Sequence, residues 1–212
     1  RGFELEQLGQ TPGKPWETWG TVTVTESAQS PFVNAYLPGS QGLTFPGNDA
    51  NNAFGLRLET AHTAETSPQL HYNIDFRNVA VSKGATGSYR FYVGHGPGNS
   101  SAVEMGATAT EFIIRNGSDY EVVRPLTVGQ WYNVQLTLDL KTRTYSGTIG
   151  FPVVLKGEGI AHKTEAGAVA LNLADAAAVE AAAMRMQASS FLVEEMVTGA
   201  VAELLVGVVR DP

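Results

Sequence analysis

Apolar and polar residues alternate in several short stretches along the first two thirds of the chain. The clearest are residues 20–25, 53–59, 69–81, 88–93 and 130–140. Successive side chains of a strand point to opposite faces, so this period of two predicts strands with one buried face. Gly, Pro and Asn residues punctuate the stretches, and no helical period interrupts them. The pattern favours an antiparallel sandwich or barrel.

Shorter apolar stretches extend this series of expected strands. The sequence at residues 116–119, Asn-Gly-Ser-Asp, is typical of a tight hairpin turn between two of them. Large aromatic side chains at Trp16 and Trp19 are expected to pin an irregular N-terminal arm to a sheet. The additional strands are predicted at residues 3–6, 32–37, 43–45, 111–115, 120–123 and 143–148.

The pattern changes after residue 149. An alanine-rich stretch at residues 176–186 strongly favours a helix, and Asp175 is a plausible N-cap for it. Short apolar strands are predicted around this helix, at residues 151–156, 168–173, 191–197 and 202–209. We expect these strands either to complete the sandwich or to form a small αβ layer packed against it.

Aromatic content supports a boundary between two parts. All aromatic residues but Phe151 and Phe191 precede residue 149. We therefore interpret the chain as two domains that meet within the segment 145–156: a β-sandwich at residues 1–148 and an αβ segment at residues 149–212.

Composition excludes several kinds of partner and chemistry. The formal net charge is −7, which argues against a nucleic-acid partner, because such partners require a basic face. The absence of Cys excludes disulfides and thiolate nucleophiles. No apolar run is long enough for a membrane span. The chain begins at Arg1 rather than Met, from which we expect a processed protein or an excised piece of a longer one.

Residues 129–147 form a Trp-x-x-Val-x-Leu-x-x-Asp strand with a return strand that ends in Gly. This segment, together with the opening residues 3–6, resembles concanavalin A-like (laminin G-like) jelly-roll domains. The resemblance covers residues 1–148 and implies an antiparallel jelly-roll sandwich. It also implies a binding module, for which carbohydrate is the expected partner, and an extracellular or cell-surface location.

No catalytic residues are predicted in the sandwich, because the Glu-x-Asp-x-x-Glu strand of catalytic jelly rolls is absent. The loops at residues 47–52 and 94–99 could supply Ca²⁺ ligands or amides to a sugar, and ordinary turns are the alternative. The histidines lack metal-ligand spacing. The tryptophans could stack on a sugar or pack in the core. The candidate glycan contacts are Trp16, Trp19, Asn48, Asp49, Asn51 and His95.

The segment after residue 149 contains several short sequence motifs, separated from one another and in a fixed order. They are Ile-Gly-Phe-Pro-Val-Val-Leu-Lys (149–156), His-Lys (162–163) with Gly-Ala-Val (167–169), Phe-Leu-Val-Glu-Glu-Met (191–196) and Ala-Val-Ala-Glu-Leu-Leu-Val-Gly (200–207), followed by Arg-Asp-Pro (210–212). Together they resemble the ATP-grasp domain of ADP-forming acyl-CoA synthetases. By this resemblance Lys156 reaches the nucleotide phosphates, Glu194, Glu195 and Met196 border the adenine, and Glu203 lies near the ribose.

The same resemblance places the Mg²⁺ ligands of such domains downstream of residue 212, so Mg-ATP or Mg-ADP is the expected cofactor only if this segment is functional. We expect an incomplete nucleotide clamp with no catalysis of its own, located in the cytoplasm by this reading. For the whole chain we favour a non-catalytic binding module. The alternatives are a nucleotide-binding acyl-CoA synthetase fragment and a chimeric chain without an evolved function.

Overall fold

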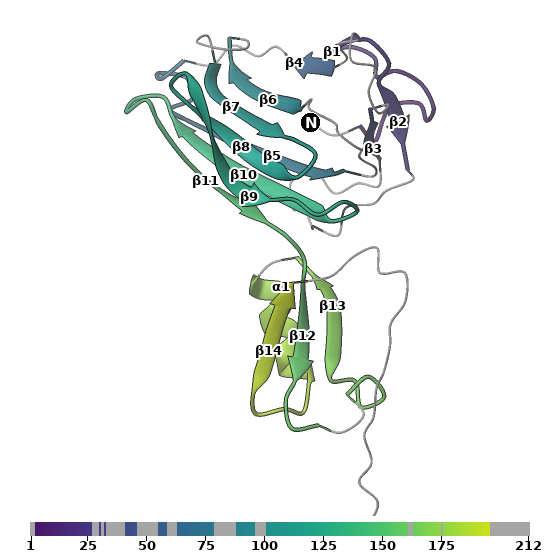
Figure 1. Ribbon diagram of the computed structural model, residues 1–212. Coiled ribbons are helices and arrows are strands. Elements are labelled where there is room, and N and C mark those ends of the chain that lie inside the picture. The colour runs from purple at the N-terminus through teal and green to yellow at the C-terminus, as the bar shows by residue number, and fades with distance from the viewer. Residues whose placement is uncertain are drawn as a thin grey trace, which may run out of the picture.

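The structure, a computed structural model, describes residues 3–26, 30, 32, 41–45, 55–58, 63–78, 88–95, 101–160, 163–174 and 176–195. Strands predominate in this part of the chain, and one alanine-rich helix, α1 (Ala176–Arg185), lies near its C-terminal end. The expected fold class is therefore confirmed in outline. A larger β-rich part is joined to a smaller α/β unit by the connection between β11 (Thr144–Gly150) and β12 (Val153–Gly157) (Figure 1).

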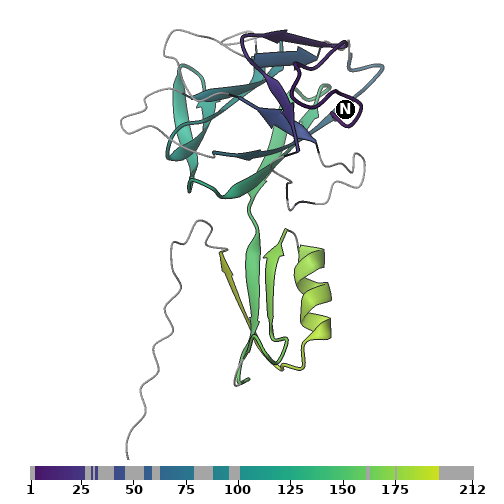
Figure 2. The ribbon, with the colours of Figure 1, turned by 90° about the vertical axis from the view of Figure 1, so that its right-hand side faces the viewer.

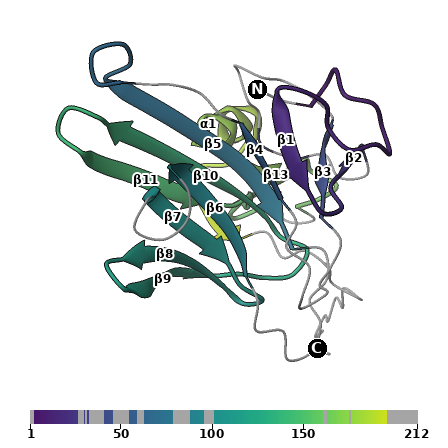
Figure 3. The ribbon, with the colours of Figure 1, turned by 90° about the horizontal axis from the view of Figure 1, so that it is seen from above.

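The β-rich part is built mainly from two antiparallel sheets that face one another (Figure 3). One sheet has the order β11-β10-β5, with β10 (Trp131–Asp139) between β11 and β5 (Gln69–Arg77). The other sheet has the order β6-β7-β8-β9, with β6 at Tyr89–Gly94, β7 at Ser101–Ala107, β8 at Glu111–Asn116 and β9 at Asp119–Pro125. The described strands form no closed barrel, and their jelly-roll topology stays a prediction.

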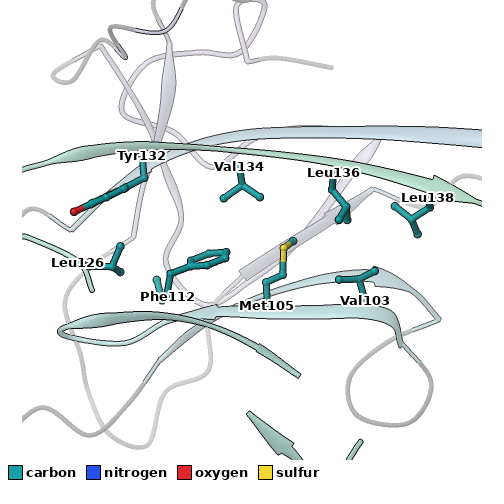
Figure 4. Packing of buried hydrophobic residues seen from close by; sticks show 9 residues of the cluster. Val103, Met105, Phe112, Leu126, Tyr132, Val134, Leu136 and Leu138 are labelled. Carbon is teal, nitrogen blue, oxygen red and sulfur yellow. The ribbon is translucent and has the colours of Figure 1, made fainter. Parts of the chain in front are cut away.

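The core lies between these two sheets and follows from the period of two. Alternate residues of β10 point inward toward β7 and β8 (Figure 4). Burying each such side chain stabilises the fold by about 1.5–3 kcal/mol. Phe76 of β5 lies in the middle, with its ring centroid 5.7 Å from that of Phe112 and 5.6 Å from that of Tyr132. The buried members of the core are Val103, Met105, Ala107, Phe112, Leu126, Tyr132, Val134, Leu136 and Leu138.

Both predicted hairpins of the β-rich part are present. In the β8–β9 hairpin, Gly117 adopts a positive φ of 64°, a conformation that glycine enters without a steric penalty. In the β10–β11 turn, the carboxylate of Asp139 accepts hydrogen bonds from the backbone N–H groups of Lys141 and Thr142, at 2.9 Å each. Side chain-to-backbone bonds of this kind favour turns and fix the strand register.

Two small two-stranded sheets are formed by strands β1 to β4. β1 (Trp16–Trp19) pairs with β4 (Gly55–Leu58), and β2 (Thr23–Thr25) pairs with β3 (Gly42–Thr44). The prediction of an edge strand at residues 3–6 is wrong, because these residues form turns. The carboxylate of Glu6 instead accepts a hydrogen bond from the Gly13 N–H at 2.8 Å, which closes a loop.

Sequence reasoning missed two strands: β1, whose residues were expected to belong to an irregular arm, and β7. The strand β7 is the more informative case. Its sequence, Ser-Ala-Val-Glu-Met-Gly-Ala, contains small residues with low β-propensity, so the alternation was hidden. The structure reveals it: Val103, Met105 and Ala107 face the core, while Glu104 points to the opposite face and is nevertheless buried. Sheet pairing on both sides of β7 overrides its weak local preference.

The C-terminal unit has its own three-stranded antiparallel sheet. Its order is β13-β12-β14, with β13 at Val169–Leu173 and β14 at Phe191–Glu195, and α1 covers one face (Figure 2). These strands pair with one another and with none of the described strands of the β-rich part. They therefore form a separate αβ layer rather than closing strands of the larger sheets. The strand predicted at residues 202–209 and the predicted N-cap Asp175 lie outside the described residues.

Candidate functional site

Two of the predicted nucleotide-site residues meet on the sheet of the C-terminal unit. Lys156 lies near the end of the central strand β12, and Glu194 lies on the neighbouring strand β14. The register pairs Lys156 with Leu192 and Glu194 with Val154, so the two charged residues are diagonal neighbours. The Lys156 ammonium nitrogen is 2.5 Å from Glu194 Oε2. The fold therefore brings together two residues that the resemblance assigned to different parts of one nucleotide site, Lys156 to the phosphates and Glu194 to the adenine.

The strand that carries Lys156 is held rigidly. Leu155 is almost fully buried, and since successive side chains alternate, Lys156 points to the opposite face. Gly157 follows, and a Cβ atom there would lie 3.0 Å from the Ala188 side chain. The loop after β12 is fastened by the Gly157 N–H, which donates to the Ala168 carbonyl at 2.8 Å. This packing fixes the base of the lysine side chain.

The end of this lysine remains accessible. The side chain of Lys156 is 39% exposed and that of Glu194 is 43% exposed, so an incoming phosphate could reach the ammonium group. Glu194 Oε2 is itself buried, which places the ion pair against the sheet surface rather than in open solvent. An ammonium group is a suitable partner for phosphate oxygens, so the arrangement can bind an anionic ligand.

The structure describes only part of the remaining residues that the ATP-grasp resemblance assigned to the site. The backbone of Glu195 ends β14, where it pairs with Val153. The side chain of Glu195, together with Met196 and Glu203, lies outside the described residues. His162 of the loop after β12 lies outside them too, whereas the Lys163 carbonyl accepts a hydrogen bond from the Ala168 N–H at 2.7 Å. The proposed adenine and ribose contacts therefore remain predictions.

The candidate glycan contacts do not form one site within the described part of the chain. Trp16 packs on Phe3, with ring centroids 5.0 Å apart, as expected for a core contact of the arm. Trp19 covers Gly55, where a Cβ atom would lie 2.6 Å from the indole. His95 is exposed beyond the end of β6. Asn48, Asp49 and Asn51 lie outside the described residues, as do residues 47–52 and 96–99 of the two candidate Ca²⁺ loops.

The described residues contain no group of three or more His, Asp or Glu side chains placed to hold a metal ion. They also contain no helix long and apolar enough to cross a membrane.

A buried ionic cluster that sequence reasoning missed surrounds Glu104. The Glu104 side chain is 4% exposed and lies on the outer face of β7. Its carboxylate is 3.2 Å from Arg115 Nη1 and 3.6 Å from Arg90 Nη1, and it accepts a hydrogen bond from the Tyr120 hydroxyl. Burial, followed by the nearby Glu104 charge, raises the pKa of Tyr92. The cluster ties β6, β7, β8 and β9 together.

The sequence signal that could have located this cluster is the alternation of apolar and polar residues in β7. The small residues of β7 make this alternation hard to recognise. The Arg90 guanidinium lies over the Tyr120 ring, 4.1 Å from the centroid. It passes beside Gly106, where a Cβ atom would be 3.2 Å from the Arg90 Cδ. The carboxylate is neutralised by two arginines, so the arrangement is suited to holding the sheet together rather than to acid–base catalysis.

Comparison with known proteins gives one match. Residues 140–212 match the family model of an ATP-grasp domain, which confirms the ATP-grasp part of the predicted resemblance. No curated protein and no solved structure matches the chain.

Proposed function

We propose that the C-terminal unit binds a nucleoside di- or triphosphate through Lys156. The observation that carries the proposal is the Lys156–Glu194 pair on β12 and β14, which lies inside the segment that matches an ATP-grasp domain. A fixed strand presents an accessible cation, which is the physical requirement for holding phosphate oxygens.

The finer proposal is a nucleotide-binding fragment of the kind found in ADP-forming acyl-CoA synthetases, with the domain beginning near residue 149. The order of the sequence motifs at residues 149–156, 191–196 and 200–207 supports it. In this proposal β14 borders the adenine, and backbone groups around Glu195 and Met196 read the base. The chain supplies binding groups on this unit, and no catalytic step is proposed for it.

The experiment is a thermal-shift and calorimetric titration of the full chain with Mg-ADP. Ligand that binds only the folded state raises the melting temperature as its concentration rises above Kd. We expect saturable stabilisation, and loss of this stabilisation in Lys156→Ala. The control is Lys141→Ala, which removes an exposed lysine from the β10–β11 turn. An unchanged melting temperature at millimolar nucleotide, or equal stabilisation of Lys156→Ala, would overturn the proposal.

For residues 1–148 we propose a concanavalin A-like jelly roll. Two facing antiparallel sheets with a core of alternating residues support this arrangement. The comparisons lend no support to carbohydrate binding by the predicted tryptophan, asparagine and histidine contacts.

A further inference from the structure

The Lys156–Glu194 pair lies on the face of the C-terminal sheet that α1 does not cover. Leu155 and Gly157 point to the other face, because side chains alternate along β12. A Cβ atom on Gly157 would lie 3.0 Å from the side chain of Ala188, in the connection that follows α1. The helix therefore packs on the face of Leu155, and the ion pair is presented to ligands on the opposite side of the sheet (Figure 2).

The strand pairing fixes a carboxylate beside the ammonium group. Lys156 lies opposite Leu192 and Glu194 opposite Val154, so the two charges stand on a diagonal between neighbouring strands. Glu194 Oε2 lies 2.5 Å from Lys156 Nζ and is shielded from solvent. The backbones of β12 and β14 are held by their ladder, and only side-chain rotation can separate the pair. A phosphate that reaches the ammonium group therefore meets the carboxylate as well.

The pair affects ligand binding more than it affects folding. The two side chains are 39% and 43% exposed, and ion pairs with such exposure contribute little to stability. Their charges cancel each other, so the pair itself offers an anion no net attraction. The carboxylate of Glu194 repels phosphate oxygens that approach Lys156. A repulsive group of this kind is a common source of specificity, because it penalises one ligand more than another.

The charge of the surrounding segment has the same sign as that of Glu194. Residues 149–212 contain eight Asp or Glu residues and four Lys or Arg residues. A metal-free nucleoside diphosphate brings several further negative charges to this surface. A divalent cation chelated by the phosphates offsets part of that charge, and a bound cation is often the largest local charge in a site. Glu194 then attracts the cation of the complex instead of only repelling the phosphates.

We propose that Glu194 makes this site select the divalent-cation complex of a nucleoside di- or triphosphate over the metal-free anion. The inference rests on the nucleotide binding proposed above for Lys156. The observation that carries it is the contact between Glu194 Oε2 and Lys156 Nζ, which places an anion at the point where the phosphates must bind. Glu194 is thus a specificity-determining residue of the site, in addition to its position on the strand proposed to border the adenine.

The test is calorimetric titration of the full chain with ADP, once with Mg²⁺ and once with EDTA. We expect Mg²⁺ to tighten binding to the wild type by about tenfold or more. Glu194→Gln removes the charge and keeps the shape. We expect this variant to bind metal-free ADP about tenfold more tightly than the wild type does, and to gain less than about threefold from Mg²⁺. The control Glu180→Gln removes the same charge from an exposed position of α1 and should keep the wild-type preference.

A second variant keeps the test decisive if Glu194→Gln fails to fold. Glu194→Thr removes the charge with a residue that favours strands, and we expect the same loss of the Mg²⁺ preference. If Mg-ADP does not bind the wild type, or binds Lys156→Ala equally well, the proposed function and this inference fall together. If Mg-ADP binding depends on Lys156 but folded Glu194 variants keep the wild-type preference for Mg²⁺, or Glu180→Gln loses it too, this inference alone is overturned.

Discussion

The guanidinium carbon of Arg124 lies 3.6 Å from the centroid of the Phe151 ring. Arg124 belongs to β9, in the four-stranded sheet, whereas Phe151 belongs to the connection between β11 and β12. Phe151 also packs against the core between the two large sheets. Phe151, the first residue after β11, is therefore anchored to the β-rich part, although it belongs to one of the sequence motifs that resemble an ATP-grasp domain.

Phe151→Ala is expected to destabilise the β-rich part and loosen the connection. It removes a partly buried ring and a cation–π contact, a loss of about 1–3 kcal/mol. Urea denaturation followed by tryptophan fluorescence measures the change, and limited proteolysis is expected to cut faster between β11 and β12. Phe151→Leu retains most of the apolar volume and serves as the control. An unchanged urea midpoint for Phe151→Ala would contradict the anchoring role.

Glu104→Gln is expected to destabilise the fold strongly. It leaves the guanidinium groups of Arg90 and Arg115 beside a neutral side chain in a buried position, which costs about 3–5 kcal/mol. The comparison variant is Glu17→Gln, which also removes a carboxylate paired with an arginine, at 2.7 Å from Arg57, but with both side chains 57% exposed. That change should cost less than about 1 kcal/mol. Equal urea midpoints for the two variants would refute the distinction.

The contrast between these two glutamates shows what the sequence could reveal. Alternation predicted β5, β10 and the hairpins, because each has a clear apolar face. It failed for β7, where small residues hide the period, and so the buried Glu104 could not be located. In the C-terminal unit the sequence motifs that contain Lys156 and Glu194 singled out two residues that form an ion pair in the structure. Their distance depends on strand order, which no local pattern specifies.

Two glycines of β11 provide a matched pair. A Cβ atom on Gly147 would lie 2.6 Å from the backbone oxygen of Gln135, whereas one on Gly150 would lie 4.0 Å from that of Asn133. Backbone cannot yield as a flexible side chain does, so we expect Gly147→Ala to destabilise the sheet by about 1–3 kcal/mol. Gly150→Ala should change stability by less than about 1 kcal/mol. Thermal unfolding compares the two, and equal melting temperatures would show that β11 shifts freely.

Tyr72 is expected to make the stability of the β-rich part fall with rising pH in the alkaline range. Burial raises the pKa of its phenol to about 12, well above the ordinary value of 10.0, as the side chain packs beside the core. The folded state therefore holds this proton more tightly than the unfolded chain does. The resulting stabilisation is fully present below about pH 10. It is lost as the pH rises toward 12, so alkali should unfold the β-rich part. Urea midpoints measured between pH 8 and pH 12 test this, with Tyr72→Phe as the matched variant. We expect the wild-type midpoint to fall more steeply than that of Tyr72→Phe, and parallel curves would exclude a role for this phenol.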